Sequence, residues 1–305
     1  MTSPRLTPLR SGLAGGLIEL RQAFSGTALA GQLLWPAATL IALFFFRHRE
    51  LPGSRLTIGA LMLPGTLGMF VAFGMMLMIQ YLPADREDGT LLRARATPGG
   101  IGGYLTGKLA TSSLSVLAYL AMIAVPGAFI TGGLHLAGIS WARLAWVLIL
   151  GMTGTQLLGA TLGALVPSPR SAGYVAFPLL GLTAVSGIFY PLTAMPGWLQ
   201  GTAQAFPVYW LGLGMRSALL PSSAASVEID GSWRTAQTAA VLGAWVLAGL
   251  VIAPVVLRRM TRRESGSRIA QRRDRSMTTA LIPNGSWRLS PPRLPDTVKA
   301  ARGCV

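Results

Sequence analysis

The sequence predicts an all-α integral membrane protein with six transmembrane helices, and two observations lead to this prediction. Of the 305 residues 51% are hydrophobic and only 12% are charged, about half the charged share of a typical soluble domain. A helix needs about 20 apolar residues to cross the hydrocarbon core of a bilayer. Six stretches meet that need, and they cover residues 27–46, 57–82, 104–130, 143–166, 173–190 and 235–257.

The distribution of positive charge predicts that both termini are cytoplasmic. The chain carries 26 Lys and Arg residues against 10 Asp and Glu residues. With both termini inside, the inside segments hold far more of the Lys and Arg residues than the outside loops, as the positive-inside rule requires. The basic excess therefore indicates membrane topology. Nucleic-acid binding would need a folded basic face with aromatic platforms, and the sequence shows none.

Three regions follow one another along the chain. Residues 1–26 form a cytoplasmic N-terminus with an apolar stripe at helical spacing, which predicts an amphipathic helix in the membrane interface; a terminal turn without a role is the alternative. Residues 27–257 form the transmembrane domain. Residues 258–305 are a basic tail that is expected to be disordered. The N-terminal stripe consists of Leu13, Leu17, Leu20 and Phe24.

Gly102, Gly107 and Lys108 match the spacing of the phosphate-binding loop G-x-x-x-x-G-K. A true phosphate loop has Ser or Thr after its lysine to ligate magnesium, and a β-strand before it. Leu109 follows the lysine here, within an apolar helical run, so the match does not predict a nucleotide site. Lys108 is expected instead to extend from the first turn of the third span toward cytoplasmic headgroups.

The charged loop at residues 83–100 is the more informative cytoplasmic segment. Its acids come first and its arginines follow, an order that suits the dipole of a short helix, which Pro98 and Gly99 would end. Such a helix can transmit force from a soluble partner to the bundle, although an ordinary solvated loop fits the residues equally well. The candidate contact residues are Asp85, Glu87, Asp88, Gly89, Thr90, Leu91 and Leu92.

Residues 191–221 are apolar and aromatic, but prolines interrupt them too often for one spanning helix. We expect short re-entrant or interfacial helices on the outer face, with Trp198, Tyr209 and Trp210 at headgroup level. The outer-loop motif consists of Pro191, Pro196, Trp198 and Pro207.

A few side chains within the spans are candidates for a substrate path. Gln156 lies near the middle of the fourth span, where a hydrogen bond to a neighbouring helix is the favoured role and substrate contact the alternative. Phe73 and Met76 are adaptable apolar contacts that would line a path or pack in the core. Gly159 and Gly163 form a G-x-x-x-G pattern that allows close helix approach, although chance is an alternative in a chain with 37 glycines.

Two blocks of the sequence resemble the permeases of ABC-2-type transporters, and drug exporters of the daunorubicin-resistance type are the most similar group. The first block is the cytoplasmic loop between spans two and three, and the second is the outer loop before the last span. The first is matched by Glu87, Gly89, Thr90, Leu91, Pro98, Gly107 and Lys108. The second is matched by Ser186, Gly187, Phe189, Pro191, Pro196, Trp198, Pro207 and Arg216.

The resemblance implies a membrane subunit of an ATP-driven exporter in the bacterial plasma membrane, with drug efflux and antibiotic resistance as its expected role. Two permease copies, in a homodimer or heterodimer, would form the pore, and separate ABC ATP-binding subunits would bind ATP and Mg. The segment around Glu87–Leu92 would be the coupling helix. This chain would then hold no catalytic residue and no cofactor. A permease for a polysaccharide or lipid-linked glycan is the alternative within the family.

Two other classes of protein are less consistent with the sequence. An ion-driven secondary transporter usually carries ionisable residues at the membrane midplane, and the six predicted spans contain no Asp or Glu. A membrane-embedded enzyme needs a constellation of His, Cys, Ser or acidic residues. His48, His135 and Cys304 are far apart in the sequence and indicate neither such a constellation nor a metal site.

Overall fold

A computed structural model of the chain describes residues 28–50, 57–96, 100–131 and 139–280. The predicted N-terminal amphipathic helix, the helix-ending Pro98 and Gly99, His135, Cys304 and the last part of the basic tail lie outside the described residues. The described part is helical, apart from connecting turns and one isolated β-bridge between Glu50 and Thr57.

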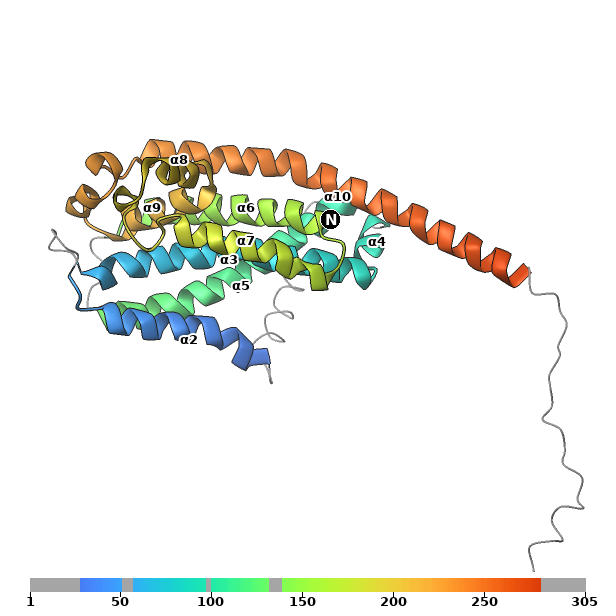
Figure 1. Ribbon diagram of the computed structural model, residues 1–305, viewed down its shortest axis with the longest axis horizontal. Coiled ribbons are helices and arrows are strands. Elements are labelled where there is room, and N and C mark those ends of the chain that lie inside the picture. Colours follow the sequence, from blue (N-terminus) through green and yellow to red (C-terminus); the bar gives the residue numbers. More distant parts are fainter. Residues whose placement is uncertain (1–27, 51–56, 97–99, 132–138, 281–305) are drawn as a thin grey trace, which may run out of the picture. The chain divides into compact units, whose positions relative to one another are not determined.

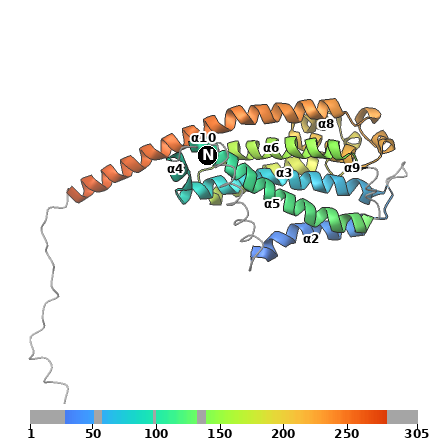
Figure 2. The same cartoon turned by 180° about the vertical axis from the view of Figure 1, so that it is seen from behind.

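Apolar sequence stretches become a bundle of helices joined mostly by short turns (Figure 1). The helices and their bounds are α2 Ala28–Phe46, α3 Ile58–Glu87, α4 Thr90–Arg95, α5 Gly100–Thr131, α6 Trp141–Leu165, α7 Ala172–Val185, α8 Gly197–Ala205, α9 Pro207–Leu219 and α10 Thr235–Ala280. Single 3-10 turns are η2 Pro169–Ser171, η3 Leu192–Ala194, η4 Ser222–Val227 and η5 Ile229–Gly231. Figures 1 and 2 both place α4 at one end of the bundle and α8 and α9 at the other.

The central helix is α3, which packs against α5, α6 and α9. Its contact with α6 depends on the two glycines of the G-x-x-x-G pattern. A β-carbon at Gly159 would collide with the Met75 carbonyl oxygen, and one at Gly163 would lie 2.9 Å from the Met78 carbonyl oxygen. The backbones approach closely because these positions carry no side chain. The role predicted for the pattern is therefore confirmed.

Among the described residues, four helices are long and apolar enough to cross a membrane: α3, α5, α6 and the Thr235–Thr261 part of α10. Leu33–Phe46 of α2 is a shorter apolar segment. The predicted fifth span, residues 173–190, corresponds to α7, which has only 14 residues and is about 21 Å long. It ends early because Ser186 caps it and Gly187 turns the chain with φ 69°.

The outer-loop prolines separate two short helices, as expected for residues 191–221. Pro196 precedes α8 and Pro207 is the first residue of α9, a position where a proline loses no helical hydrogen bond. The headgroup placement predicted for Tyr209 and Trp210 is wrong, because both side chains are buried. Trp198 is 73% exposed. Tyr209 and Trp210 lie in a buried apolar cluster with Leu192, Ala203 of α8 and Leu242 of α10, and Trp146 of α6 packs against this cluster.

The chain divides into two compact units, Met1–Thr261 and Arg262–Val305. Helix α10 begins in the first unit and continues without interruption to Ala280. The predicted tail boundary at residue 257 is therefore not the end of the helix, and residues 258–280 are helical where disorder was expected. No proline occurs between Pro254 and Pro283, and the Arg, Met, Gln and Ala residues between them favour helix.

Candidate functional site: the 85–92 segment and an apolar cavity

The seven candidate contact residues lie at one end of the bundle, in the 85–92 segment. They do not form one short helix. Asp85 and Glu87 belong to the last turn of α3, and α4 begins only at Thr90. The predicted dipole pairing of these acids with a short helix is therefore wrong. Pro83 does not end α3, because it is buried within a helix that continues to Glu87.

Gly89 makes the turn between α3 and α4. Its φ of 74° and ψ of 9° lie in the left-handed region, which glycine enters without steric penalty. Its amide donates a hydrogen bond to the Arg86 carbonyl oxygen at 3.2 Å. No atom lies within 4 Å of a β-carbon built on Gly89, so this residue acts through backbone shape and not through packing.

Leu91 anchors α4 to the rest of the bundle. Its side chain has no exposed surface and lies in a cluster of buried apolar residues from five helices. The cluster consists of Met78 and Leu82 of α3, Leu91 of α4, Ile101 and Leu105 of α5, Leu157, Ala160 and Ala164 of α6, and Ala253, Leu257 and Met260 of α10. Helix α4 packs against α3 and α5, so a displacement of α4 acts directly on these two helices and, through the shared cluster, on α6 and α10. Outward from the same segment, Glu87 and Asp88 are exposed.

Asp85 points inward and joins α3 to α5. Its Oδ2 lies 3.1 Å from Lys108 Nζ and accepts a hydrogen bond of 2.5 Å from Tyr104. The Lys108 ammonium also lies 4.3 Å from the Tyr81 ring centroid, within cation–π range. Lys108 is in the third turn of α5, and its side chain is 10% exposed. The prediction that it extends freely toward headgroups is therefore wrong, since it pairs with Asp85 inside the bundle.

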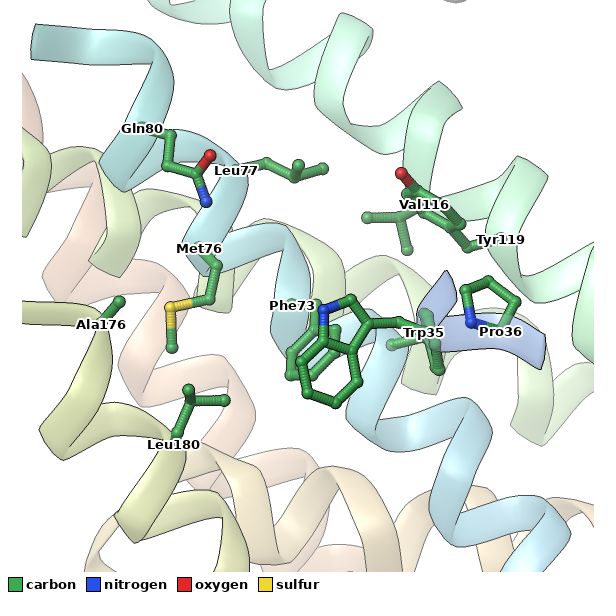
Figure 3. Close-up of a pocket in the computed structure, with 11 residues that line it drawn as sticks. Trp35, Pro36, Phe73, Met76, Leu77, Gln80, Val116, Tyr119, Ala176 and Leu180 are labelled. Carbon is green, nitrogen blue, oxygen red and sulfur yellow. The ribbon is translucent and has the colours of Figure 1, made fainter. Parts of the chain in front are cut away.

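Two of the three substrate-path candidates line a cavity of about 270 Å³ between α2, α3, α5 and α7. Phe73 and Met76 project into it from α3, together with Gln80. Figure 3 shows the rings of Trp35 and Phe73 near its middle, with Met76 and Leu180 on one side and Tyr119 on the other.

Gln156 does not line this cavity. Its side chain is fully buried, and its Oε1 accepts a hydrogen bond of 3.2 Å from Ser113 of α5. Its Nε2 has no hydrogen-bond partner among the described residues. The favoured prediction, a bond to a neighbouring helix, is thus confirmed.

At the opposite end of the bundle, the outer-loop segment is held by a buried ion pair. Arg216 Nε of α9 lies 2.7 Å from Glu228 Oε1, and both side chains are 1% exposed. The Arg216 guanidinium also donates to the carbonyl oxygens of Gly187 at 3.3 Å and Ile188 at 2.9 Å. Arg216 therefore ties together α9, the turn after α7 and the loop before α10. Burial, and then the Glu228 carboxylate, raise the pKa of nearby Tyr209 above its ordinary value.

Sequence reasoning missed both the ion pair and most of the cavity wall. Trp35 and Tyr119 were hidden among other apolar residues of their spans, and no spacing rule connects residues of different helices. One feature of the sequence could have indicated the ion pair. A buried arginine requires a partner of opposite charge, and Glu228 is one of few acids in the segments that are predicted to lie outside.

The described residues contain no group of three or more His, Cys, Asp or Glu side chains placed to hold a metal ion. The family model described as ABC-2 type transporter matches residues 21–220 of the chain. No curated protein matches the sequence.

Proposed function

Since the chain belongs to the ABC-2 type transporter family, we propose that it is the membrane-spanning permease subunit of an ATP-driven exporter that moves a hydrophobic drug, antibiotic or other lipophile outward. A separate ABC ATP-binding subunit binds and hydrolyses the ATP. The permease carries the substrate path and converts movement of that partner into movement of the bundle.

The observation that supports this proposal best is the construction of the 85–92 segment. Its exposed acids, Glu87 and Asp88, offer negative charge to a soluble partner, while Leu91 is buried among four long helices. A push on the segment is thus delivered to the bundle through packed side chains, which resist compression. The Asp85–Lys108 pair carries the same displacement to α5.

The proposed arrangement in the membrane has six crossings with both termini in the bacterial cytoplasm. The four long helices are joined by α2 and α7, which cross where a partner helix or a thinned bilayer accommodates their length. The 85–92 segment then faces the cytoplasm, and α8 and α9 lie at the outer side as interfacial or re-entrant helices. A second permease copy, identical or homologous, completes the transport path.

Uptake into inside-out membrane vesicles tests this function. Vesicles from cells that produce the chain and its ATP-binding subunit are expected to accumulate the neutral dye Nile red when ATP is supplied. Uptake should persist when ionophores dissipate the ion gradients, and vesicles that lack this chain provide the control. Collapse of uptake without the gradients, while ATP is maintained, would instead indicate a secondary transporter. Substantial ATP hydrolysis by the purified chain alone would also contradict the proposal.

A further inference from the structure

The cavity between α2, α3, α5 and α7 has the features of a small-molecule site, and its wall indicates what it binds. Three of its aromatic residues brace one another. The Phe70 ring lies 5.3 Å from that of Phe73 and 5.9 Å from that of Tyr119, centroid to centroid. Because Phe70 is only 2% exposed, its ring is held in the core and supports the rings of Phe73 and Tyr119. The aromatic wall is therefore formed in the absence of a ligand.

Trp35 completes the aromatic wall from α2. Its side chain is 59% exposed, and within the described part of the chain its indole stacks on no other aromatic ring. The indole of Trp35 and the ring of Phe73 both line the cavity, and both are drawn in Figure 3. Aromatic faces prefer offset or edge contact with another ring. The exposed indole of Trp35 therefore favours a flat aromatic ligand over a flexible chain.

The polar groups of the wall are few and uncharged. None of the eleven described lining residues is ionised at neutral pH. Gln80 offers an exposed amide that has no hydrogen-bond partner among the described residues, so two N–H donors and a carbonyl acceptor are available at this end of the cavity. A charged ligand would lose hydration without gaining an ion pair, and a glycan would leave most of its hydroxyl groups unpaired.

The cavity is partly open, so its volume indicates the size of the part of a ligand that it can enclose. An apolar protein cavity of about 150 Å³ binds benzene, and the present cavity is about 270 Å³. Two or three fused rings fit this space, and it lies just below the usual range of about 300–1,000 Å³ for ligand pockets.

We infer that this cavity binds an uncharged, flat aromatic compound of two or three fused rings, which contacts Trp35 and Phe73 through its faces and hydrogen-bonds Gln80 through a single polar group. This inference rests on the proposed function, because it names the substrate class of the exporter. Met76 and Leu180 contact the edges of the rings and allow small variations in their shape.

Equilibrium binding to the purified full chain in lipid nanodiscs tests the inference without the ATP-binding subunit. The probes are three anthracenes with the same rings: 9-anthracenemethanol, 9-anthracenecarboxylate and 9-(aminomethyl)anthracene. Fluorescence anisotropy reports binding, and empty nanodiscs give the lipid partition to be subtracted. We expect saturable binding of the alcohol, with affinity at least about tenfold higher than that of either charged analogue. Absence of saturable alcohol binding, or equal affinity for a charged analogue, would overturn the inference.

Matched variants locate the binding. Trp35→Ala is expected to weaken alcohol binding by about tenfold, because it removes one aromatic face. Trp35 is exposed, so we expect this variant to fold normally. Phe129→Ala removes an aromatic ring of α5 that is 82% exposed and does not line the cavity, and binding should not change. Equal effects of these two variants would contradict the location.

Two further comparisons test the ligand class. Gln80→Leu should weaken binding of the alcohol by about three- to tenfold, as expected for one hydrogen bond, and leave the binding of unsubstituted anthracene unaffected.

Decanol has a similar hydroxyl on a flexible chain. If it displaces the anthracene alcohol at equal or lower concentration, the cavity is an acyl-chain groove and the inference is wrong. Since none of these measurements involves ATP, failure here leaves ATP-driven transport of another substrate class intact, and failure of vesicle transport leaves the binding result intact.

Discussion

Glu228→Ala is expected to destabilise the protein by about 3–5 kcal/mol, since it leaves the buried Arg216 guanidinium without its counter-charge. Both side chains are 1% exposed, and their charged atoms lie 2.7 Å apart. The bonds from Arg216 to Gly187 and Ile188 remain in the variant, but neutral carbonyl groups do not offset a buried positive charge. Thermal unfolding of the purified protein in detergent, followed by tryptophan fluorescence, measures the effect.

Two controls separate loss of the ion pair from loss of charge or packing. Asp230→Asn removes an exposed acid two residues away and keeps a side chain that tolerates the left-handed conformation at φ 60°; it should change stability by less than about 0.5 kcal/mol. Replacing both partners, Arg216→Met with Glu228→Leu, should restore much of the lost stability because no buried charge remains unpaired. A Glu228→Ala protein as stable as the Asp230→Asn protein would contradict this role.

Gly89→Pro is expected to reduce ATP-dependent transport strongly while the protein still inserts in the membrane. Proline holds φ near −65°, but Gly89 requires 74°, and the hydrogen bond from its amide to Arg86 is lost. The turn must open and α4 must shift. Loss of about 1–3 kcal/mol of coupling between the ATP-binding subunit and the bundle corresponds to a fall of about 5- to 150-fold in the coupled response. Vesicle uptake, normalised to the amount of permease, gives the measurement.

Gly89→Asn is the matched control, because asparagine enters the left-handed region more readily than other residues and no atom lies within 4 Å of the new β-carbon. Its transport should remain close to that of the wild-type protein.

Glu87→Ala tests the partner contact separately. The side chain is exposed, so its removal should reduce transport without reducing the stability of the protein. Retained transport in both Gly89→Pro and Glu87→Ala would exclude a coupling role for the 85–92 segment.

Much of the fold can be predicted from local features of the sequence, namely long apolar runs, small residues and the positions of prolines. A chain in lipid must satisfy its backbone hydrogen bonds within helices, so long apolar runs mark α3, α5, α6 and α10 with little ambiguity. Gly159 and Gly163 likewise predict a close contact with another helix, because their spacing places both on one face of α6. Prolines 196 and 207 mark helix starts because a proline is tolerated there.

The predictions from sequence are wrong where contacts between distant segments determine where a helix ends or a side chain lies. The charged loop is predicted to begin at residue 83, yet α3 continues to Glu87, so Asp85 and Glu87 belong to α3 and not to the short helix that follows. Lys108 resembles a headgroup anchor by position alone, whereas its partner Asp85 lies 23 positions earlier in the chain. Tyr209 and Trp210 look interfacial by composition and are buried in a cluster with Leu192, Ala203 and Leu242. The cavity assembles residues of four helices, and no single-segment pattern encodes such a set.

The most direct test of the central claim, that the 85–92 segment contacts a separate ATP-binding subunit, uses site-specific photo-cross-linking. Cys304 is the only cysteine, so a Cys304→Ser background accepts a unique thiol. Glu87→Cys places it in the segment, and Trp198→Cys places it on an exposed residue at the opposite end of the bundle. Each thiol is labelled with benzophenone maleimide in a complex that hydrolyses ATP. The account predicts a cross-link to the ATP-binding subunit from position 87 and none from position 198; a cross-link from position 198, or none from position 87, would contradict it.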